Sequence, residues 1–339
     1  MKPQQILDLE ESMKVFDFKL NNIGEVILLN LRDNEIMDLK HLVELVPFDI
    51  RFIKEYNGIT DLSPLAGLVN LETLFIGNNR ITDLSPLAGL VNLKTLLIGN
   101  NTFTDLSPLA GLVNLKNINL NANNISDLSS LAGLTQLELL CLGDNRITDL
   151  SHLAGLVNLK TLFLAENHIS DLSPLARLVN LKNIDLSYNS ITDFSALSGL
   201  TQLKTINLST NKIIDLSPLA GLTRLKTINF SSNKIFDLRP LAGLVNLKSI
   251  NLDLNKIFDL RPLAELVNLE ELDLILNQIT DLRPLLGLNK MEMLSLSDNK
   301  IKDISPLSGM VNLGTLFISN NNFSDLSPLA GLVSLENII

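Results

Sequence analysis

The sequence predicts an α/β solenoid, in which short parallel strands and short helical turns stack along one axis. One 22-residue unit recurs twelve times without a gap from Ile59 to Asn322. Each unit contains the pattern L-x-x-L-x-L-x-x-N, whose L-x-L core alternates in the manner of a strand. A fixed period of about 20–50 residues is the signature of stacked repeats. Stacking also explains how 339 residues can form one continuous core.

Each repeated position has an expected structural role. The alternation predicts a strand with Leu74 and Ile76 pointing inward and Phe75 pointing outward, and successive strands lie parallel at about 4.8 Å. The asparagine near the end of each unit, such as Asn79, is expected to bond backbone groups in a buried turn. The aspartate at the third position, such as Asp61, precedes L-S-P-L and is expected to begin a short helical turn. That role favours a structural reading of the aspartates over calcium binding.

The two ends of the chain depart from the unit. Residues 1–22 contain Ile6, Leu9, Met13 and Phe16 at helical spacing, which predicts an N-terminal helical cap. The solenoid is then predicted to span 23–339. It comprises two degenerate units, the twelve regular units from 59 to 322, and a partial unit over 323–339 that stops inside its expected strand. Because such an end leaves backbone groups unpaired, we expect either a fragment of a longer protein or self-association through this end.

Composition narrows the class of protein. Hydrophobic residues make up 46% of the chain but aromatic residues only 4%, which predicts a core of leucine and isoleucine with nearly uniform size. The net charge of −10 argues against general nucleic-acid binding. Cys141 is the sole cysteine, which excludes an internal disulfide and fits a reducing compartment. No signal peptide or membrane-spanning run is visible, so we expect a cytoplasmic protein or one exported without a classical signal peptide.

The phrase I-T-D-L-S-P-L-A-G-L-V-N-L at Ile59–Leu71 resembles the leucine-rich repeat family in its 22-residue subclass. It looks most like the repeats of bacterial internalins, and it is also similar to those of the nuclear regulator of protein phosphatase 1. The resemblance covers 23–339 and implies a curved parallel sheet on the concave face with short 3-10 turns on the convex face. It further implies protein–protein recognition, mostly by the concave face, without catalysis. The export signal of internalins and the immunoglobulin-like domain that many of them carry are not seen.

The outward strand positions vary between units, and we place the candidate site there. Four of the first five residues in the central outward column are apolar, and the next six are polar. Contiguous outward apolar residues are typical of a binding surface. A leucine-rich sheet that merely tolerates apolar residues is the alternative. The predicted partner-binding residues are Phe75, Leu97, Leu139, Cys141 and Phe163 on the apolar side, and Asp185, Asn207, Asn229, Asn251 and Asp273 on the polar side.

Three further patterns leave alternatives open. The column of Asn207, Asn229 and Asn251 is either a hydrogen-bonded amide ladder or a polar docking surface. A second apolar cluster is either a secondary contact or packing against a missing C-terminal segment. Lysine columns, three arginines in place of serine, and two phenylalanines near them favour solvated faces over docking of an acidic partner or nucleic acid. The cluster is Leu254, Ile275, Leu276 and Met293; the arginines are Arg239, Arg261 and Arg283; the phenylalanines are Phe236 and Phe258.

Catalysis has little support in the sequence. His41, His152 and His168 fall at unrelated repeat positions, and the glycines occur singly rather than in a phosphate-binding loop. We therefore expect no cofactor, no metal and no enzyme. The predicted function is a non-enzymatic scaffold that binds a protein partner on its concave face, as a bacterial adhesin or effector. The alternatives are an intracellular regulator of a phosphatase type and the sensor region of a larger signalling enzyme.

Overall fold

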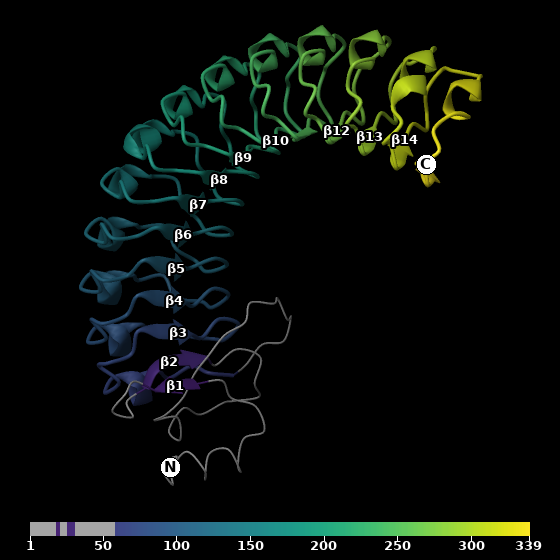
Figure 1. Cartoon of the computed structure of the whole chain (residues 1–339). Helices are drawn as coiled ribbons and strands as arrows, with labels where there is room; N and C mark the ends of the chain where they lie inside the picture. Colours follow the sequence, from purple (N-terminus) through teal and green to yellow (C-terminus); the bar gives the residue numbers. More distant parts are fainter. Residues whose placement is uncertain (1–17, 21–25, 31–57) are drawn as a thin grey trace, which may run out of the picture. The chain divides into compact units, whose positions relative to one another are not determined.

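The computed structural model describes residues 18–20, 26–30 and 58–339 (Figure 1). The chain divides into two compact units, Met1–His168 and Ile169–Ile339. Below, "first unit" and "second unit" refer to these two parts of the chain and not to single 22-residue repeats. Within each unit, strands lie side by side along one face and 3-10 helices lie along the other, as Figure 1 shows for the second unit on the inner and outer sides of a curve. The predicted solenoid of parallel strands and short 3-10 turns is confirmed.

The strands are short because only three positions of each repeat alternate. Those of the first unit are β1 (Phe18–Leu20), β2 (Val26–Asn30), β3 (Thr73–Phe75), β4 (Thr95–Leu97), β5 (Asn117–Asn119), β6 (Leu139–Cys141) and β7 (Thr161–Phe163). Those of the second unit are β8 (Asn183–Asp185), β9 (Thr205–Asn207), β10 (Thr227–Asn229), β11 (Ser249–Asn251), β12 (Glu271–Asp273), β13 (Met293–Ser295), β14 (Thr315–Phe317) and β15 (Asn337–Ile338).

One 3-10 helix follows the aspartate of each repeat. Those of the first unit are η1 (Ser63–Leu65), η2 (Ser85–Leu87), η3 (Ser107–Leu109), η4 (Ser129–Leu131) and η5 (Ser151–Leu153). Those of the second unit are η6 (Ser173–Arg177), η7 (Ser195–Leu197), η8 (Ser217–Leu219), η9 (Arg239–Leu241), η10 (Arg261–Leu263), η11 (Arg283–Leu285), η12 (Ser305–Gly309) and η13 (Ser327–Leu329).

The pairing between strands follows the repeat position by position. Leu74 of β3 lies opposite Leu96 of β4, and the same equivalence holds at the other parallel pairs described within each unit. Leu29 of β2 lies opposite Leu74, so the first degenerate unit is in the predicted phase. β2 pairs directly with β3, although the second degenerate unit, 36–58, separates them in the sequence. Residues 31–57 lie outside the described residues.

The N-terminal segment differs from the predicted helix at its end. Residues 1–17 lie outside the described part of the chain, but 18–20 form β1, which pairs antiparallel with β2. A strand here satisfies backbone donors and acceptors that the first edge of the sheet would otherwise expose. At 18–20 the chain is therefore a strand rather than part of a helix, whereas the helical stripe from Ile6 to Phe16 lies outside the described residues.

The core lies between the strands and the 3-10 helices. The inward residues of the repeat, such as Leu74 and Ile76, are fully buried in unit after unit. The prediction that leucine and isoleucine form the core is confirmed at all but a few positions. Phe103, Phe194 and Phe230 are the largest fully buried side chains, so the core accepts rings where most units have isoleucine or leucine.

The turn asparagines hold neighbouring repeats together, as predicted. The Asn145 Nδ2 group donates to the carbonyl oxygens of Leu120, Leu142 and Gly143 at 3.0–3.1 Å. Its Oδ1 atom accepts the backbone N–H of Ile125 at 3.0 Å. A single asparagine therefore satisfies four backbone groups in a buried turn, where unpaired groups are costly.

One of these turns is incomplete. The buried Oδ1 atom of Asn123 has no hydrogen-bond partner. Its repeat begins with Phe103, where eleven of the thirteen repeats have isoleucine. The backbone bond from Asn124 to Phe103 is 3.4 Å long, whereas the matching bond from Arg146 to Ile125 is 2.9 Å. The turn that begins at Phe103 is thus more open than its counterpart at Ile125, and its amide oxygen is unsatisfied.

The aspartates cap the 3-10 helices rather than gather around a cation. Asp61 accepts the backbone N–H and the hydroxyl of Ser63, both at 2.8 Å. The same backbone bond recurs at each aspartate of the column through Asp325. At Asp83, these two donors from Ser85 hold the pKa below its usual value. Proline in the first turn of most of these helices completes the predicted start signal.

Candidate functional site

The outward strand positions form a continuous surface in each unit, which we call the strand face. In the first unit, Leu97 lies opposite Phe75 on one side and Asn119 on the other. Cys141 lies opposite both Asn119 and Phe163. The register therefore brings the predicted apolar residues into one row across β3 to β7. Leu139, one position earlier on β6, lies opposite Asn117 and Thr161.

Exposure along this row is uneven. Phe163 is 37% exposed, and Leu97 and Leu139 are half-buried. Phe75 is only 4% exposed and Cys141 only 7%, so these two offer little surface to a partner. Their outward position was expected to expose them. Cys141 is small and lies between two larger side chains on the adjacent strands, which accounts for its burial.

The Cys141 thiol is chemically quiet. Burial raises its pKa to about 11, so the thiol remains protonated at neutral pH. A thiolate is the reactive form of cysteine, and no charged group stabilises it here. Cys141 is thus a packing residue of the strand face rather than a nucleophile.

The strand face of the second unit is polar. Asp185 lies opposite Asn207, and the row continues through Asn229 and Asn251 to Asp273. Asn207 donates to Asp185 at 3.1 Å, and Asn251 donates to Asp273 at 3.2 Å. Among the described residues, no hydrogen bond joins the three amides to one another. The uninterrupted amide ladder is therefore replaced by two amide–carboxylate pairs.

Each of these asparagines also has a local structural role. The Oδ1 atoms of Asn207 and Asn229 accept backbone N–H groups two residues further along the chain, at 3.0–3.1 Å. Such bonds hold the outward side chains in place along the strand. The row is consequently a fixed array of polar groups, which suits recognition because little side-chain freedom is lost on binding.

Asp253 is a strand-face residue that the sequence reading missed. It follows β11 and accepts the backbone N–H of Ile275 at 2.6 Å. Burial, followed by the neighbouring charge of Asp273, raises its pKa to about 6. Burial also raises the pKa of Asp273. The available signal was an acidic side chain at a position where most other repeats have glycine, alanine or serine.

Replacing Asp253 with asparagine is expected to stabilise the protein at pH 7. Because the folded-state pKa is raised, the folded protein binds the proton more tightly, and stability falls as pH rises from about 4 through 6. The variant removes this loss, about 1 kcal/mol after allowance for solvent screening. Asn121 shows that an amide fits, since its Oδ1 atom accepts the Gly143 N–H at 2.7 Å. Urea denaturation of both proteins at pH 4.5 to 8, in steps of about half a unit, measures the change.

Asp83→Asn is the matched control with the opposite sign. Ser85 holds the Asp83 pKa below its usual value, so this carboxylate stabilises the fold at neutral pH and loses that effect in acid. The control is expected to lower stability at pH 7. If Asp253→Asn also lowers stability at pH 7, the burial argument for Asp253 is wrong.

The second apolar cluster borders the acidic part of the strand face. Leu254 and Leu276 are about half exposed, and Ile275 and Met293 are half-buried. Both leucines have positive φ, at 55° and 56°. That conformation recurs at this position in every regular unit and favours glycine or asparagine, so leucine is costly there.

The other chemical candidates are dispersed. His152 is half-buried and His168 exposed, in unrelated parts of their repeats, and His41 lies outside the described residues. Within 18–20, 26–30 and 58–339, no three His, Cys, Asp or Glu side chains are grouped so as to hold a metal. In the same part of the chain, no helix has the length and apolar character required to cross a membrane.

The lysine column beside the strands is partly neutralised. Lys160 pairs with Glu138, and Lys248 pairs with Glu270 at 2.5 Å. Both pairs are exposed, and such pairs contribute little stability. The column is therefore a solvated edge of the strand face rather than a distinct site.

Comparison with known proteins identifies the family of this fold. A family model described as leucine-rich repeats matches six stretches that together span most of the chain: residues 53–89, 91–133, 135–177, 179–221, 267–309 and 289–331. The structure is similar to that of an internalin, inlF, from Listeria monocytogenes, with 37% identity and a TM-score of 0.81 over 83% of this chain and 84% of that one. No curated protein sequence matches the chain.

Two further solved structures share the fold. A leucine-rich repeat protein of Leptospira interrogans is 24% identical, with a TM-score of 0.71 over 83% of this chain and 81% of that one. The ectodomain of the Arabidopsis receptor kinase HAESA, solved with a peptide hormone, is 25% identical, with a TM-score of 0.78. That match covers 100% of this chain but 62% of the ectodomain. The fold is thus one that typically serves as a non-enzymatic interaction scaffold.

Proposed function

This chain belongs to the leucine-rich repeat family, and from that premise we propose that it captures a protein partner on its strand face. Phe163 carries the proposal. Its ring is exposed, while its neighbours Leu162 and Leu164 are fully buried and fill the core. The ring therefore has no role in holding the strand, and an exposed aromatic side chain is typical of the centre of a binding surface.

The two parts of the strand face would contribute differently. Leu97 and Phe163 supply apolar contact area in the first unit. The polar row from Asp185 to Asp273 supplies fixed donors and acceptors in the second unit, which favour specificity more than affinity.

The likeness to an internalin, at 37% identity over 84% of that chain, supports an adhesin or effector role over the phosphatase-regulator alternative. The receptor kinase ectodomain was solved with a peptide hormone, which supports a peptide-sensing role as a second candidate. Both roles place the partner on exposed outward residues. The compartment, cytoplasmic or external, stays a prediction from the sequence.

Leu97→Ser combined with Phe163→Ser is expected to abolish partner capture without lowering the melting temperature. Neither side chain is fully buried, so the cost in stability is small. Phe75 is left intact because truncating a ring that is 4% exposed would also destabilise the fold. Proteins retained by the immobilised chain from cell extracts are compared by mass spectrometry between wild type and variant.

Val91→Ser combined with Val113→Ser is the matched control. These valines are exposed in the same unit but lie next to the 3-10 helices rather than on the strands. The control is expected to retain the same proteins as wild type. The proposal fails if the strand-face variant retains them too, or if both variants lose them equally.

A further inference from the structure

A patch on one flank of the second unit departs from the repeat in several neighbouring copies. At the second position of the 22-residue repeat, three consecutive copies have an apolar residue: Ile214, Phe236 and Phe258. Most other copies have threonine or serine there. At the fifth position, arginine replaces serine in three consecutive copies. We call this set the flank patch: Ile214, Phe236, Phe258, Arg239, Arg261 and Arg283. It lies away from the strands: the apolar members fall between the turn asparagines and the 3-10 helices, and the arginines are the first residues of η9, η10 and η11.

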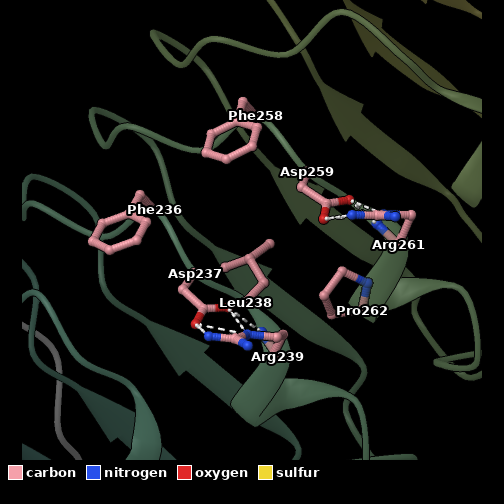
Figure 2. Close-up of a pocket in the computed structure, with 8 residues that line it drawn as sticks. All are labelled: Phe236, Asp237, Leu238, Arg239, Phe258, Asp259, Arg261 and Pro262. Atoms are coloured by element: carbon pink, nitrogen blue, oxygen red, sulfur yellow. Dashed lines mark hydrogen bonds and ion pairs between the residues drawn. The ribbon is translucent and has the colours of Figure 1, made fainter.

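The flank patch is exposed and hollowed. Phe236 is 49% exposed and Phe258 57% exposed, and Ile214 is similarly accessible. Adjacent exposed apolar residues, unlike scattered ones, mark an interaction surface. Figure 2 shows the two rings on one side of a groove and the Asp237–Arg239 and Asp259–Arg261 pairs beneath them. The groove has a volume of about 310 Å³. This is the lower end of the range of about 300–1,000 Å³ for ligand pockets, and it suits one or two side chains of a docked segment.

The arginines are not required by the fold. In an ordinary copy, Asp215 accepts the Ser217 backbone N–H at 2.8 Å and its hydroxyl at 2.6 Å. In the flank patch, Asp237 still accepts the backbone N–H of Arg239, at 3.0 Å. The guanidinium then replaces the hydroxyl, with contacts of 2.7–3.0 Å from Nε and Nη2 to the carboxylate. Serine caps the helix equally well, so the arginine side chain points to a role outside the fold.

The pairing with aspartate fixes each guanidinium without using all of it. Nε and Nη2 of Arg261 contact Asp259 at 2.8–3.1 Å, while Nη1 takes no part in the pair. An arginine has five N–H donors, and the Nη1 donors remain directed away from the carboxylate. Arg239 and Arg261 thus present two rigid donor groups on consecutive repeats, beside the exposed rings.

The flank is positively charged within an acidic chain. Lysine occurs two residues before each apolar member, at Lys212, Lys234 and Lys256. With the three arginines, the four flank segments 212–217, 234–239, 256–261 and 278–283 hold six basic and four acidic side chains. The whole chain has a net charge of −10. Among the described residues, the ion pairs do not include Lys234 or Lys256, and both are exposed.

From this geometry we infer that the flank patch docks an extended acidic segment of a protein partner. An aromatic or aliphatic side chain of that segment occupies the groove beside Phe236 and Phe258. Its carboxylates face Lys234, Lys256 and the Nη1 groups of the arginines. Charge complementarity of this kind raises association rates and selects the partner. This surface is separate from the strand face, so its use is independent of the function proposed above.

A single-stranded nucleic acid also combines stacking with negative charge, but the flank patch suits it less well. Affinity for a phosphate backbone grows with the number of phosphates that a protein neutralises. Each guanidinium charge is partly offset by an aspartate within 2.8 Å, so the flank patch offers only a few anion contacts, enough for a short acidic segment but not for a long phosphate backbone. The remaining lysines are few, and the net charge of the chain is repulsive to nucleic acid.

The test is selection from a random twelve-residue peptide library displayed on phage, against the immobilised full chain at low ionic strength. The comparison variant restores the residues of ordinary repeats: Phe236→Thr, Phe258→Thr, Arg239→Ser and Arg261→Ser. Selected peptides are expected to place aspartate or glutamate beside an aromatic or aliphatic residue. Their binding, measured by fluorescence anisotropy of labelled synthetic copies, is expected to weaken about tenfold or more in the restored variant.

Two controls keep the outcome interpretable. The restored variant should keep its melting temperature, because Ser217 shows that serine completes the cap. The Leu97→Ser, Phe163→Ser variant should bind the selected peptides as wild type does, which separates this surface from the strand face. The inference is overturned if no peptide is enriched, if the enriched peptides are not acidic, or if they bind the restored variant equally. Tighter binding of labelled oligouridine than of any peptide, lost on restoration, would overturn it in favour of nucleic acid.

Discussion

Asn277→Ala is expected to lower the free energy of unfolding by about 2–3 kcal/mol, because the buried Ile257 N–H loses its partner and three carbonyl oxygens each lose one of two donors. The Asn277 Nδ2 group donates to the carbonyl oxygens of Leu252, Leu274 and Ile275 at 3.0–3.3 Å. Its Oδ1 atom accepts the Ile257 N–H at 2.9 Å. Water has little access to this turn, since Asn277 is almost completely buried. Urea denaturation followed by circular dichroism measures the loss.

Asn246→Ala is the control for loss of an asparagine side chain at the surface. Asn246 donates a single bond, to the Thr223 carbonyl at 2.9 Å, and it is exposed. Its removal is expected to cost less than about 1 kcal/mol. Equal losses for the two variants would contradict the assigned role of the turn asparagines.

Asn277→Asp separates hydrogen bonding from packing. The substitution keeps the shape but directs a carboxylate at three carbonyl oxygens. We therefore expect the pKa of the introduced group to be raised in the folded protein, and stability to fall as pH rises above about 4. In acid, the neutral carboxyl can donate one hydrogen bond and recover part of the loss. A pH-independent loss would show that packing alone is responsible.

Phe194→Ala and Phe230→Ala are each expected to cost about 3–5 kcal/mol, the usual effect of truncating a buried ring. Both rings are essentially inaccessible to solvent. They come from neighbouring repeats and contact each other, with ring centroids 5.4 Å apart and planes inclined at 51°. Because they share a contact, the double variant should lose less than the sum of the single losses, by about 0.5–1.5 kcal/mol. Urea denaturation of all four proteins completes the cycle.

Phe194→Leu and Phe230→Leu are the matched controls. Leucine occupies the position of Phe194 in most other units and that of Phe230 in several of them, so these variants restore ordinary repeats. They should each cost less than the alanine variants, because leucine leaves a smaller cavity. Additive losses in the alanine cycle would mean that the two rings do not stabilise each other directly.

Most of the fold could be predicted from the sequence because each repeat imposes the same local contacts. The alternation around Leu74 and Ile76 determines which side chains are buried, and Asn79 and Asp61 complete the turns on either side. Position within the repeat therefore determines register. The contacts that could not be predicted are those between side chains at different positions of the repeat. Phe194 and Phe230 lie 36 residues apart at different repeat positions, and only the packed structure brings their rings together.

The sequence predicted which residues of the candidate site occupy equivalent strand positions, but not how exposed each side chain is. The sequence placed Phe75 and Phe163 at equivalent positions, and the structure agrees, yet only Phe163 is appreciably exposed. Exposure depends on neighbouring side chains that the repeat does not specify. Asp253 was not predicted because it lies two positions after Asn251, outside the central outward column on which the site prediction was based. The residues of the flank patch could be identified in the sequence, but the groove beside them and the Asp–Arg pairing are seen only in the structure.

The range of the asparagine contacts has a consequence for how such a chain changes over generations. Asn145 reaches backbone groups at most 25 residues away, so its bonds involve its own copy and the one before it. Unequal crossing-over that adds or removes one whole copy in phase leaves every remaining asparagine with equivalent partners. An insertion of any other length places the wrong residues opposite the turn. The gene can therefore alter the length of the array, and with it the span of both surfaces, only in steps of one complete copy.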